Sequence, residues 1–409
     1  MTDELPRTEL LRTEALSRHF KIGSALSRRT LHAVDDVSFA IGEREIVALA
    51  GESGSGKSTI ARVLARIYKP TSGEVFFEGK PLSSMTSRQQ RLRYSGLVPM
   101  VFQDPFSSIN PVFRVQHGVL RCLKLHRPSL SAPQRLEEAA RVFDVVGLSP
   151  DMLQRFPYEL SGGQRQRVGF AQALAMRPKL ILADEPVSML DVSIRIGLLN
   201  LMGKLRDEEG VSILYITHDI ASARYVADKL IVMYAGQIAE TGPIEDVLTH
   251  PRHPYTQLLL SAVPDPRAPL SVAAETDRGE PPRVIDPTPG CRFRWRCPLA
   301  IDKCAQVTPE LAELSTPAGG SGGVVPPGKH RHDAACHVAQ TSSEEVKAPW
   351  LGKHSHEACR DRRGIHLHAR ARGRDRAAAA GRDRLRARRP RRGPARGGGA
   401  GVGPDRGRP

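Results

Sequence analysis

The sequence predicts an α/β fold: a parallel sheet with a helical insertion in its middle and a small irregular extension at its C-terminal end. Three observations support this. An apolar strand runs straight into a glycine-rich loop and a helix over 46–68. Helices and strands alternate from 164 to 234, and the pattern between these two regions is mainly helical. Such alternation is typical of parallel sheets.

The elements around the glycine-rich loop follow from local composition. Residues 31–50 are rich in β-branched types, and Gly42 divides them into two expected strands. The second strand contains "EIVALA" and leads directly into Gly51. The segment "STIARVLARIY" has helical spacing, and Pro70 lies just past its end. Residues 73–79 are bounded by glycines and predict a short strand.

The pattern changes between about 86 and 160, where "VLRCLKLH" and "PQRLEEAARVFDVVGL" predict helices. After this insertion we expect helices over 164–176, 192–207 and 219–227 and strands over 180–184, 211–216 and 229–234. From about 246 the periodicity fades and proline becomes common. Residues 314–328 predict a flexible loop.

The net charge of +16 is concentrated in the tail. Residues 360–409 hold 17 Arg, no Lys and 4 Asp, a net charge of +13, which leaves the body of the protein at +3. The balanced body argues against a specific nucleic-acid partner. With almost no large apolar residues, the tail over 341–409 is expected to be disordered. An RNA-binding or lipid-binding tail fits this composition, but we favour a G+C-rich gene read in a shifted frame or past its normal stop.

No apolar stretch approaches the roughly 20 residues that a membrane helix needs. The first 20 residues are mixed and charged, without the apolar run of a secretory signal. We therefore expect a soluble protein, or one attached to a membrane through other proteins. Without an export signal, the six cysteines do not predict a disulfide framework.

The loop "GESGSGKST" fits the pattern G-x-x-x-x-G-K-[ST] of a phosphate-binding P-loop. Its glycines let backbone N–H groups turn onto phosphate oxygens, and the helix that follows adds its positive end. Lys57 is expected to reach the β- and γ-phosphates, and Ser58 to hold Mg²⁺. The nucleotide-binding residues expected here are Gly51, Ser53, Gly54, Ser55, Gly56, Lys57, Ser58 and Thr59.

The segment "LILADEP" places Asp184 and Glu185 at the end of an apolar strand. A carboxylate at this point is suited to bind Mg²⁺ through water, and its neighbour to polarise an attacking water. Alone this pattern is weak, because many buried strands end in Asp. The P-loop earlier in the chain makes it specific.

A second candidate anion site lies at "LSGGQRQRV", residues 160–168. Ser161 is suited to cap a helix, and Gly162 and Gly163 leave backbone N–H groups open to an anion. No lysine or magnesium ligand accompanies them. The segment can therefore complete a phosphate site but cannot build one.

These motifs, in this order, resemble the ATP-binding subunits of ABC transporters, whose signature motif is "LSGGQ". The resemblance implies a P-loop NTPase over 8–245, with a RecA-like parallel sheet, an antiparallel β part and a helical subdomain over about 90–165. It also implies that two subunits pack head to tail, so that the signature motif of one closes over nucleotide held by the P-loop of the other. The signature residues are Ser161, Gly162, Gly163 and Gln164.

The resemblance assigns further roles one residue at a time. Gln103 in "VFQDP" is similar to the glutamine that touches Mg²⁺ and the attacking water, and His218 in "YITHD" to the histidine that orients the γ-phosphate. Asp191 in "SMLD" resembles the conserved loop aspartate of the family, although Met189 stands where alanine is more common. Phe20 in "LSRHF" resembles the aromatic residue that stacks on adenine, and a core role for it stays open.

Three segments narrow the resemblance to the oligopeptide/dipeptide (peptide/nickel) uptake group: "VFQDPFSSINP", "HPYTQLLLSAVP" and "PGCRFRWRCPLAIDKC". The last two belong to an expected C-terminal extension over 246–340. The resemblance implies an ATPase on the cytoplasmic face of the cell membrane. Its implied partners are two membrane permeases, a second ATP-binding subunit and an extracytoplasmic peptide-binding protein. Import of nickel or another small solute, and a non-transport ABC ATPase, stay open.

Four cysteines lie in the extension, spaced C-x5-C-x6-C-x31-C: Cys291, Cys297, Cys304 and Cys336. Zinc sites usually use closer pairs, so the spacing disfavours zinc. Four thiolates suit an iron–sulfur cluster, and the resemblance implies a [4Fe–4S] centre in some members of the group. A cluster and free thiols both stay open here, and zinc or a disulfide is the less favoured alternative.

Overall fold

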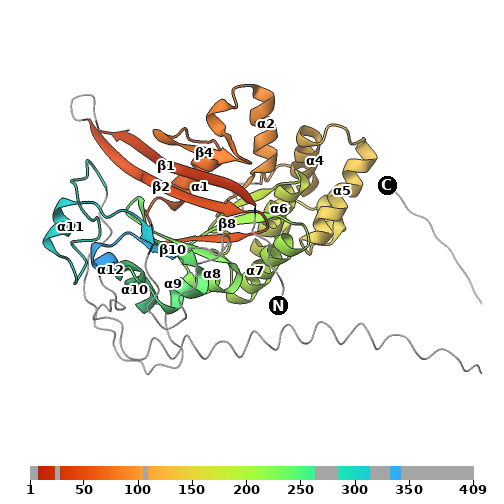
Figure 1. Ribbon diagram of the computed structural model, residues 1–409. Helices are drawn as coiled ribbons and strands as arrows, with labels where there is room; N and C mark the ends of the chain where they lie inside the picture. Colours follow the sequence, from red (N-terminus) through yellow and green to blue (C-terminus); the bar gives the residue numbers. More distant parts are fainter. Residues whose placement is uncertain (1–7, 24–27, 105–108, 263–283, 314–331, 342–409) are drawn as a thin grey trace, which may run out of the picture. The chain divides into compact units, whose positions relative to one another are not determined.

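The computed structural model describes residues 8–23, 28–104, 109–262, 284–313 and 332–341. These residues all belong to the unit Met1–Cys359, and Figure 1 shows their elements. The predicted loop at 314–328 and the predicted disordered tail over 341–409, apart from residue 341, which ends a short helix, lie outside the described residues.

The large sheet is parallel at its centre, with strands in the order β11-β12-β10-β9-β3-β8-β7-β6. Every residue of β3, β7 and β8 is buried, as expected of strands that are covered on both faces. The predicted parallel α/β fold is confirmed. The parallel strands are β3 (Ile46–Ala50), β6 (Met100–Val101), β7 (Leu180–Asp184), β8 (Ser212–Thr217) and β9 (Lys229–Tyr234).

A second sheet is antiparallel and has the order β2-β1-β4-β5. Strand β1 was not predicted, although its residues Leu10, Leu11 and Leu16 are buried. These positions do not follow a period of two, because bulges shift the register of β1 against β2. The strands are β1 (Glu9–Ile22), β2 (Arg29–Gly42), β4 (Ser72–Phe77) and β5 (Lys80–Pro81).

Helix α1 (Lys57–Leu64) lies between the two sheets, as Figure 1 shows by its label between β2 and β8. Ile60 and Leu64 are fully buried, and they share one apolar cluster with residues of both sheets. The helix ends earlier than its sequence pattern predicts. The chain turns away at Arg66, whose φ of 59° is left-handed.

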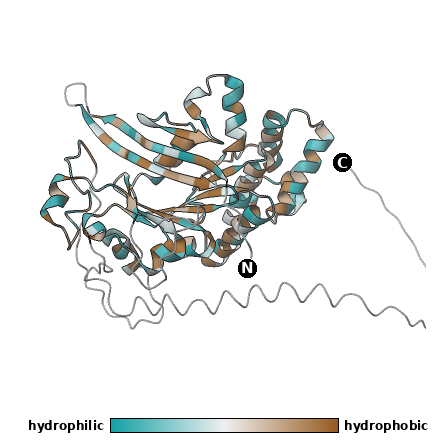
Figure 2. Cartoon of the chain, in the orientation of Figure 1, coloured by the Kyte–Doolittle hydropathy of each residue, from teal (hydrophilic) through white to brown (hydrophobic). Residues whose placement is uncertain are grey.

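The other face of the large sheet is covered by helices, several of which form the helical insertion. Helices α2, α5 and α6 each begin with a complete serine capping box, at Ser87, Ser131 and Ser161. Figure 2 shows hydrophobic residues on the central strands, and both hydrophobic and hydrophilic residues on the surrounding helices. Helix α2 (Arg88–Leu97) packs instead against α1 and the antiparallel sheet, through Tyr94. The other helices are α4 (Val115–His126), α5 (Ala132–Val145), α6 (Gly162–Ala175), α7 (Val192–Asp207), α8 (Ile220–Val226) and α9 (Ile244–Thr249), with 3₁₀ turns at Leu82–Ser84, Pro150–Gln154 and Pro157–Glu159.

The C-terminal extension continues the large sheet. Strand β12 pairs with β10, and β11 pairs with β12. Tyr255 and Phe293 are buried in the apolar cluster that also holds residues of α6–α9. No helix within the described ranges is long and apolar enough to cross a membrane. The remaining elements are β10 (Gln237–Pro243), α10 (Pro254–Ser261), α11 (Asp302–Gln306), β11 (Ala312–Glu313), β12 (Asp333–Ala334) and α12 (His337–Thr341).

His253 joins the extension to the sheet. Its Nδ1 accepts a hydrogen bond from the amide of Tyr255 at 3.0 Å and caps α10, while its own amide donates to Glu240 at 2.9 Å. Burial lowers the pKa of His253 to about 4, although the charge of Glu240 opposes the shift. The imidazole is therefore neutral in the folded protein at pH values where an unfolded histidine is already protonated.

We predict that His253→Asn reduces the dependence of the free energy of unfolding on pH between pH 7 and pH 5. Asparagine keeps a capping oxygen but does not titrate. In the wild type, stability is lost as pH falls from the ordinary histidine pKa of about 6.5 toward 4, by about 2 kcal/mol between pH 7 and pH 5. Urea unfolding at both pH values measures the difference. The control is His250→Asn at an exposed site, and an unchanged slope in His253→Asn would contradict the prediction.

Candidate functional site

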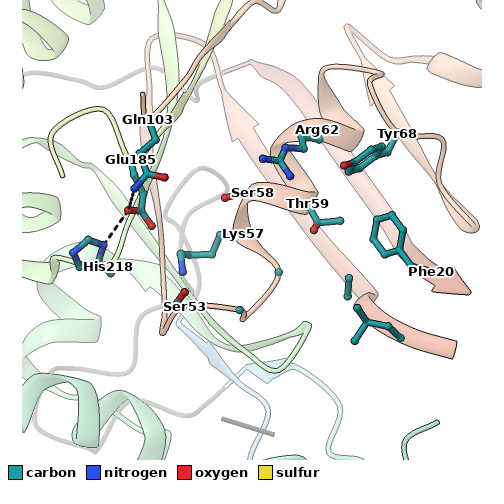
Figure 3. Close-up of a pocket in the computed structure, with 14 residues that line it drawn as sticks. Phe20, Ser53, Lys57, Ser58, Thr59, Arg62, Tyr68, Gln103, Glu185 and His218 are labelled. Carbon is teal, nitrogen blue, oxygen red and sulfur yellow. Dashed lines mark hydrogen bonds and ion pairs between the residues drawn. The ribbon is translucent and has the colours of Figure 1, made fainter. Parts of the chain in front are cut away.

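A pocket of about 820 Å³ lies where β3 ends in the P-loop. Figure 3 shows Gln103, Glu185 and His218 grouped on one side, Lys57 and Ser58 in the middle, and Phe20 and Tyr68 on the other side. The pocket is lined by Phe20, Leu31, Ala33, Ser53, Gly54, Gly56, Lys57, Ser58, Thr59, Arg62, Tyr68, Gln103, Glu185 and His218.

The path of the P-loop requires glycine at two positions. Gly51 has a φ of 151°, and a Cβ there would lie 2.2 Å from the carbonyl oxygen of Met233. Gly56 has a φ of 106°, and its Cβ would lie 2.3 Å from the carbonyl oxygen of Ala33. Any side chain at these positions would push the loop away from both sheets. The P-loop therefore packs closely against both sheets in the residues that precede α1.

Lys57 and Ser58, the first residues of α1, make polar contacts within the loop and with β7. The ammonium group of Lys57 donates to the carbonyl oxygens of Gly51 and Glu52, both at 2.8 Å. Burial lowers the pKa of Lys57, and the nearby carboxylates of Glu185 and Asp184 oppose that shift. The hydroxyl of Ser58 donates to Oδ1 of Asp184 at 2.8 Å. A hydroxyl and a carboxylate at this separation suit a magnesium ion.

Glu185 is the centre of three predicted residues. Nε2 of Gln103 donates to Oε2 of Glu185 at 3.1 Å, and Nδ1 of His218 lies 3.2 Å from the same oxygen. The backbone of Glu185 has a φ of 46°, which is uncommon for a non-glycine residue and is often found at functional sites. This arrangement holds a carboxylate at the pocket wall, beside an amide and an imidazole.

The opposite side of the pocket is aromatic. The rings of Phe20 and Tyr68 meet edge to face with centroids 5.4 Å apart, and the guanidinium group of Arg18 lies 4.5 Å from the centroid of Phe20. Tyr68 and Arg62 also line the pocket and were not predicted from the sequence. A signal for Arg62 was available, because it lies four residues after Ser58 and shares its face of α1.

The signature residues do not line this pocket in their own chain. Ser161 caps α6 and accepts a hydrogen bond from the amide of Gln164 at 3.3 Å, while Gln164 accepts one from the amide of Ser161. Ser161 is exposed, and Gly162 and Gly163 begin the helix. Asp191, at the start of α7, is also exposed and outside the pocket lining.

The structure brings the four cysteines of the extension close to one another. Burial raises the pKa of Cys291 to about 11, and the neighbouring thiols of Cys304 and Cys336 add to the shift. Burial likewise raises the pKa of Cys297 to about 12, with contributions from the other three thiols. All four are free thiols.

The spacing of these sulfurs does not fit a single zinc ion. Among the described residues, the one group of three ligand atoms within 4.8 Å of one another is His19, His32 and Asp35. No three sulfurs therefore lie that close, whereas the sulfurs around a tetrahedral zinc ion are about 3.8 Å apart.

The group around Asp35 fastens the extension to the antiparallel sheet. Arg292 donates to Asp35 and to the carbonyl oxygen of Ala235. Nε2 of His19 and Nδ1 of His32 lie 2.9 Å and 3.3 Å from the carboxylate. Burial opposes ionisation of Asp35, but its hydrogen bond with His19 and the charge of Arg292 outweigh it and lower the pKa. The carboxylate is thus already paired within the protein.

Two family models match the chain. Residues 34–188 match the ABC transporter model, and residues 239–304 match the model of the oligopeptide/dipeptide transporter C-terminal region. The first match contains the P-loop, Gln103, the signature motif and Glu185. The second begins in β10 and reaches Cys304.

Curated relatives match over most of their own length. A provisionally named peptide import ATP-binding protein of Brucella ovis is 41% identical over 310 residues, covering 76% of this chain and 96% of the relative. The oligopeptide transport ATP-binding protein AppF of Bacillus subtilis is 40% identical over 311 residues, covering 75% and 94%.

A solved structure shares the fold of the ATP-binding part. The ATP-binding cassette MJ0796, solved as a dimer in a post-hydrolysis state with ADP and phosphate, is 28% identical with a TM-score of 0.52. The match covers 57% of this chain and 99% of that one. The resemblance drawn from the sequence motifs is confirmed: the chain belongs to the ABC transporter family of ATP-binding proteins and carries the C-terminal region of the oligopeptide/dipeptide transporters.

Proposed function

We propose that this chain is the ATP-hydrolysing subunit of an importer for oligopeptides or dipeptides. The carrying observation is the convergence of Gln103 and His218 on Glu185 at the wall of a pocket that also contains Lys57. The peptide class is supported by the matching C-terminal region and by relatives named for peptide import.

In this proposal each part of the pocket has one task. The P-loop amides and Lys57 hold the phosphates, and the adenine lies against Phe20 and Tyr68. Ser58, Asp184 and Gln103 hold Mg²⁺, which neutralises charge that builds up on the phosphates. Glu185 orients and polarises the attacking water, and His218 positions the γ-phosphate. The protein accelerates transfer to water mainly through positioning and charge.

The site is completed by a second ATP-binding subunit, either identical or homologous. Ser161, Gly162 and Gly163 are absent from the pocket lining of their own chain, although the free amides at the start of α6 suit an anion. The solved relative MJ0796 is a dimer with ADP and phosphate. Large apolar side chains are exposed beside Asp191, as an interface would need. They are Met189, Val192 and Ile196.

We propose that a different apolar surface receives the membrane permeases. Phe102 is exposed next to Gln103, and Val112, Phe113 and Tyr158 are exposed on the helical insertion. Residues 112–116 and 154–158 lie side by side, because the amide of Val115 donates to the carbonyl oxygen of Arg155. Docking there would place the chain peripherally on the cytoplasmic face of the membrane. An extracytoplasmic binding protein would deliver the peptide to the permeases.

We propose further that the four thiols of the extension hold a [4Fe–4S] cluster. The donor set fits, because four thiols close enough to influence one another are available and cysteine thiolates are the usual ligands of such a cluster. No three sulfurs crowd within 4.8 Å, which suits a multi-iron centre better than one ion.

We expect Glu185→Gln to bind ATP normally and to lower kcat by at least about 100-fold, because the amide does not polarise water. Phosphate release and equilibrium nucleotide binding measure the two properties. Glu208→Gln, an exposed change at the end of α7, is the control. Near-normal hydrolysis by Glu185→Gln would refute the assigned role.

We expect Gly162→Asp to keep nucleotide binding but to lose ATP-dependent dimerisation in the Glu185→Gln background. A Cβ at Gly162 makes only an ordinary 3.7 Å contact with Leu190, so the fold should tolerate the change. The new carboxylate would repel the phosphate of the opposing subunit. Size-exclusion chromatography with ATP tests this, with Gly203→Asp on α7 as the matched control.

Mixing Lys57→Ala with Gly162→Asp, both in the otherwise native chain, separates a composite site from a defect in folding. Each variant alone is expected to be inactive, whereas a mixed dimer contains one site with both halves intact. Recovery of hydrolysis on mixing supports the head-to-tail assembly. Dimerisation of the Gly162→Asp variant as in its control would contradict it.

We expect anaerobic reconstitution with iron and sulfide to give the absorption and paramagnetic signals of an iron–sulfur cluster. Cys304→Ser should lower the iron content, because Cys304 is one of the four proposed donors and is buried. Cys122→Ser, which changes a cysteine on α4, should leave it unchanged. Equal iron content in both variants would rule out this assignment.

A further inference from the structure

We propose that the C-terminal extension holds the P-loop in its binding conformation through three residues, Glu52, Tyr255 and Arg296, which we call the P-loop clamp. This inference rests on the proposed ATPase function and adds positioning residues to it. The clamp does not touch the phosphates. It acts on the peptide unit that orients Lys57, and so determines how tightly ATP is bound.

The first contact of the clamp is with the loop backbone. The amide of Glu52 donates to the hydroxyl of Tyr255 at 2.9 Å. Tyr255 is fully buried, and burial raises the pKa of its phenol, which therefore stays neutral. Its ring packs against Tyr234 and Phe293, with centroids 4.5 Å and 5.5 Å away. The acceptor for this amide is thus fixed by a packed aromatic group.

This hydrogen bond orients the peptide unit between Gly51 and Glu52. The N–H of that unit points to Tyr255, and its carbonyl oxygen accepts from the ammonium group of Lys57 at 2.8 Å. Because a peptide unit is planar, its two ends cannot turn independently. Tyr255 therefore fixes the direction of the carbonyl group that Lys57 binds.

The second contact is a bidentate ion pair. The guanidinium group of Arg296 donates to both oxygens of Glu52, at 2.8 Å and 3.0 Å. The side chains of Arg296 and Glu52 are 12% and 23% exposed, so water screens the pair only in part. Burial opposes the charge on Arg296, but its hydrogen bonds to Glu52 and the charge of that carboxylate outweigh burial and raise the pKa of Arg296. The hydrogen bonds of such a bidentate pair are stronger than those between neutral groups, and the pair also fixes the relative orientation of the two side chains.

Glu52 is suited to this task because it lies in the P-loop without lining the pocket. The sheet supplies the other fixed points, including the amide of Gly236, which donates to the carbonyl oxygen of Ser55 at 2.9 Å. Without the clamp, the stretch around Glu52 loses its side-chain anchor. ATP binding would then have to order that stretch, which weakens affinity.

The test compares Arg296→Met, Glu52→Gln and Tyr255→Phe in the full-length chain. Dissociation constants for a fluorescent ATP analogue, KM and kcat are measured together with the thermal midpoint. We expect Arg296→Met and Tyr255→Phe to raise the dissociation constant and KM by about 10-fold with kcat within about threefold, because chemistry at Glu185 is untouched. The double variant Glu52→Gln/Arg296→Met should bind within about twofold of Arg296→Met alone.

The matched control is the pair of Arg224 and Glu245, which is also bidentate, at 3.1 Å and 2.9 Å, but joins α8 to α9. Arg224→Met should leave ATP affinity unchanged. An equal loss of affinity in this control would show a general effect of removing an ion pair and would overturn the clamp. So would additive losses from Glu52→Gln and Arg296→Met.

The outcomes also separate the clamp from the proposed function. Normal ATP affinity in both Arg296→Met and Tyr255→Phe, with an active wild type, overturns the clamp and leaves the ATPase intact. A wild type that neither binds nor hydrolyses ATP overturns the proposed function itself. Should Arg296→Met fail to fold, Glu52→Gln still decides, because it removes the charge and leaves the packing of Arg296 in place.

Discussion

The whole arrangement depends on a backbone path that only glycine can follow. At Gly51 and Gly56 the P-loop passes so close to the carbonyl oxygens of Met233 and Ala33 that a Cβ would collide with each. One contact comes from the large sheet and the other from the antiparallel sheet. The loop is therefore the point at which both sheets and α1 meet. Phosphate-binding amides gain their fixed direction from this packing, and not from the loop alone.

The same constraint explains why one chain holds an incomplete site. Because the P-loop is held between the two sheets, it can contact only one side of a bound nucleotide. Lys57, Ser58 and Asp184 lie on that side. The start of α6 offers backbone amides behind the capping residue Ser161 but no cation, and it lies outside the pocket of its own chain. In the proposed assembly, two such incomplete halves form one complete site when the subunits associate, and ATP binding is thereby linked to movement of the subunits.

Local patterns were enough to predict much of the fold and most of the site. Strands β7 and β9 and helix α7 have the predicted bounds, because continuous apolar runs and helical spacing are read within one segment. The P-loop and the residues near Glu185 were found through motifs a few residues long. Strand β1 was missed because bulges break its alternation, and Tyr68 was missed because no motif marks it. Contacts between distant segments leave no such local trace.

The ion pair between Glu52 and Arg296 illustrates that limit, since the two residues are 244 positions apart. Each looks ordinary in sequence: an acidic residue in a P-loop and an arginine in a basic stretch. Folding brings the two residues into contact, because the extension packs against the P-loop. Arg296 lies in the turn between Cys291 and Cys297. Within this turn, the amide of Arg296 donates a hydrogen bond to the carbonyl oxygen of Phe293. A change at the thiols that alters the conformation of this turn is therefore expected to alter the ion pair between Arg296 and Glu52 of the P-loop.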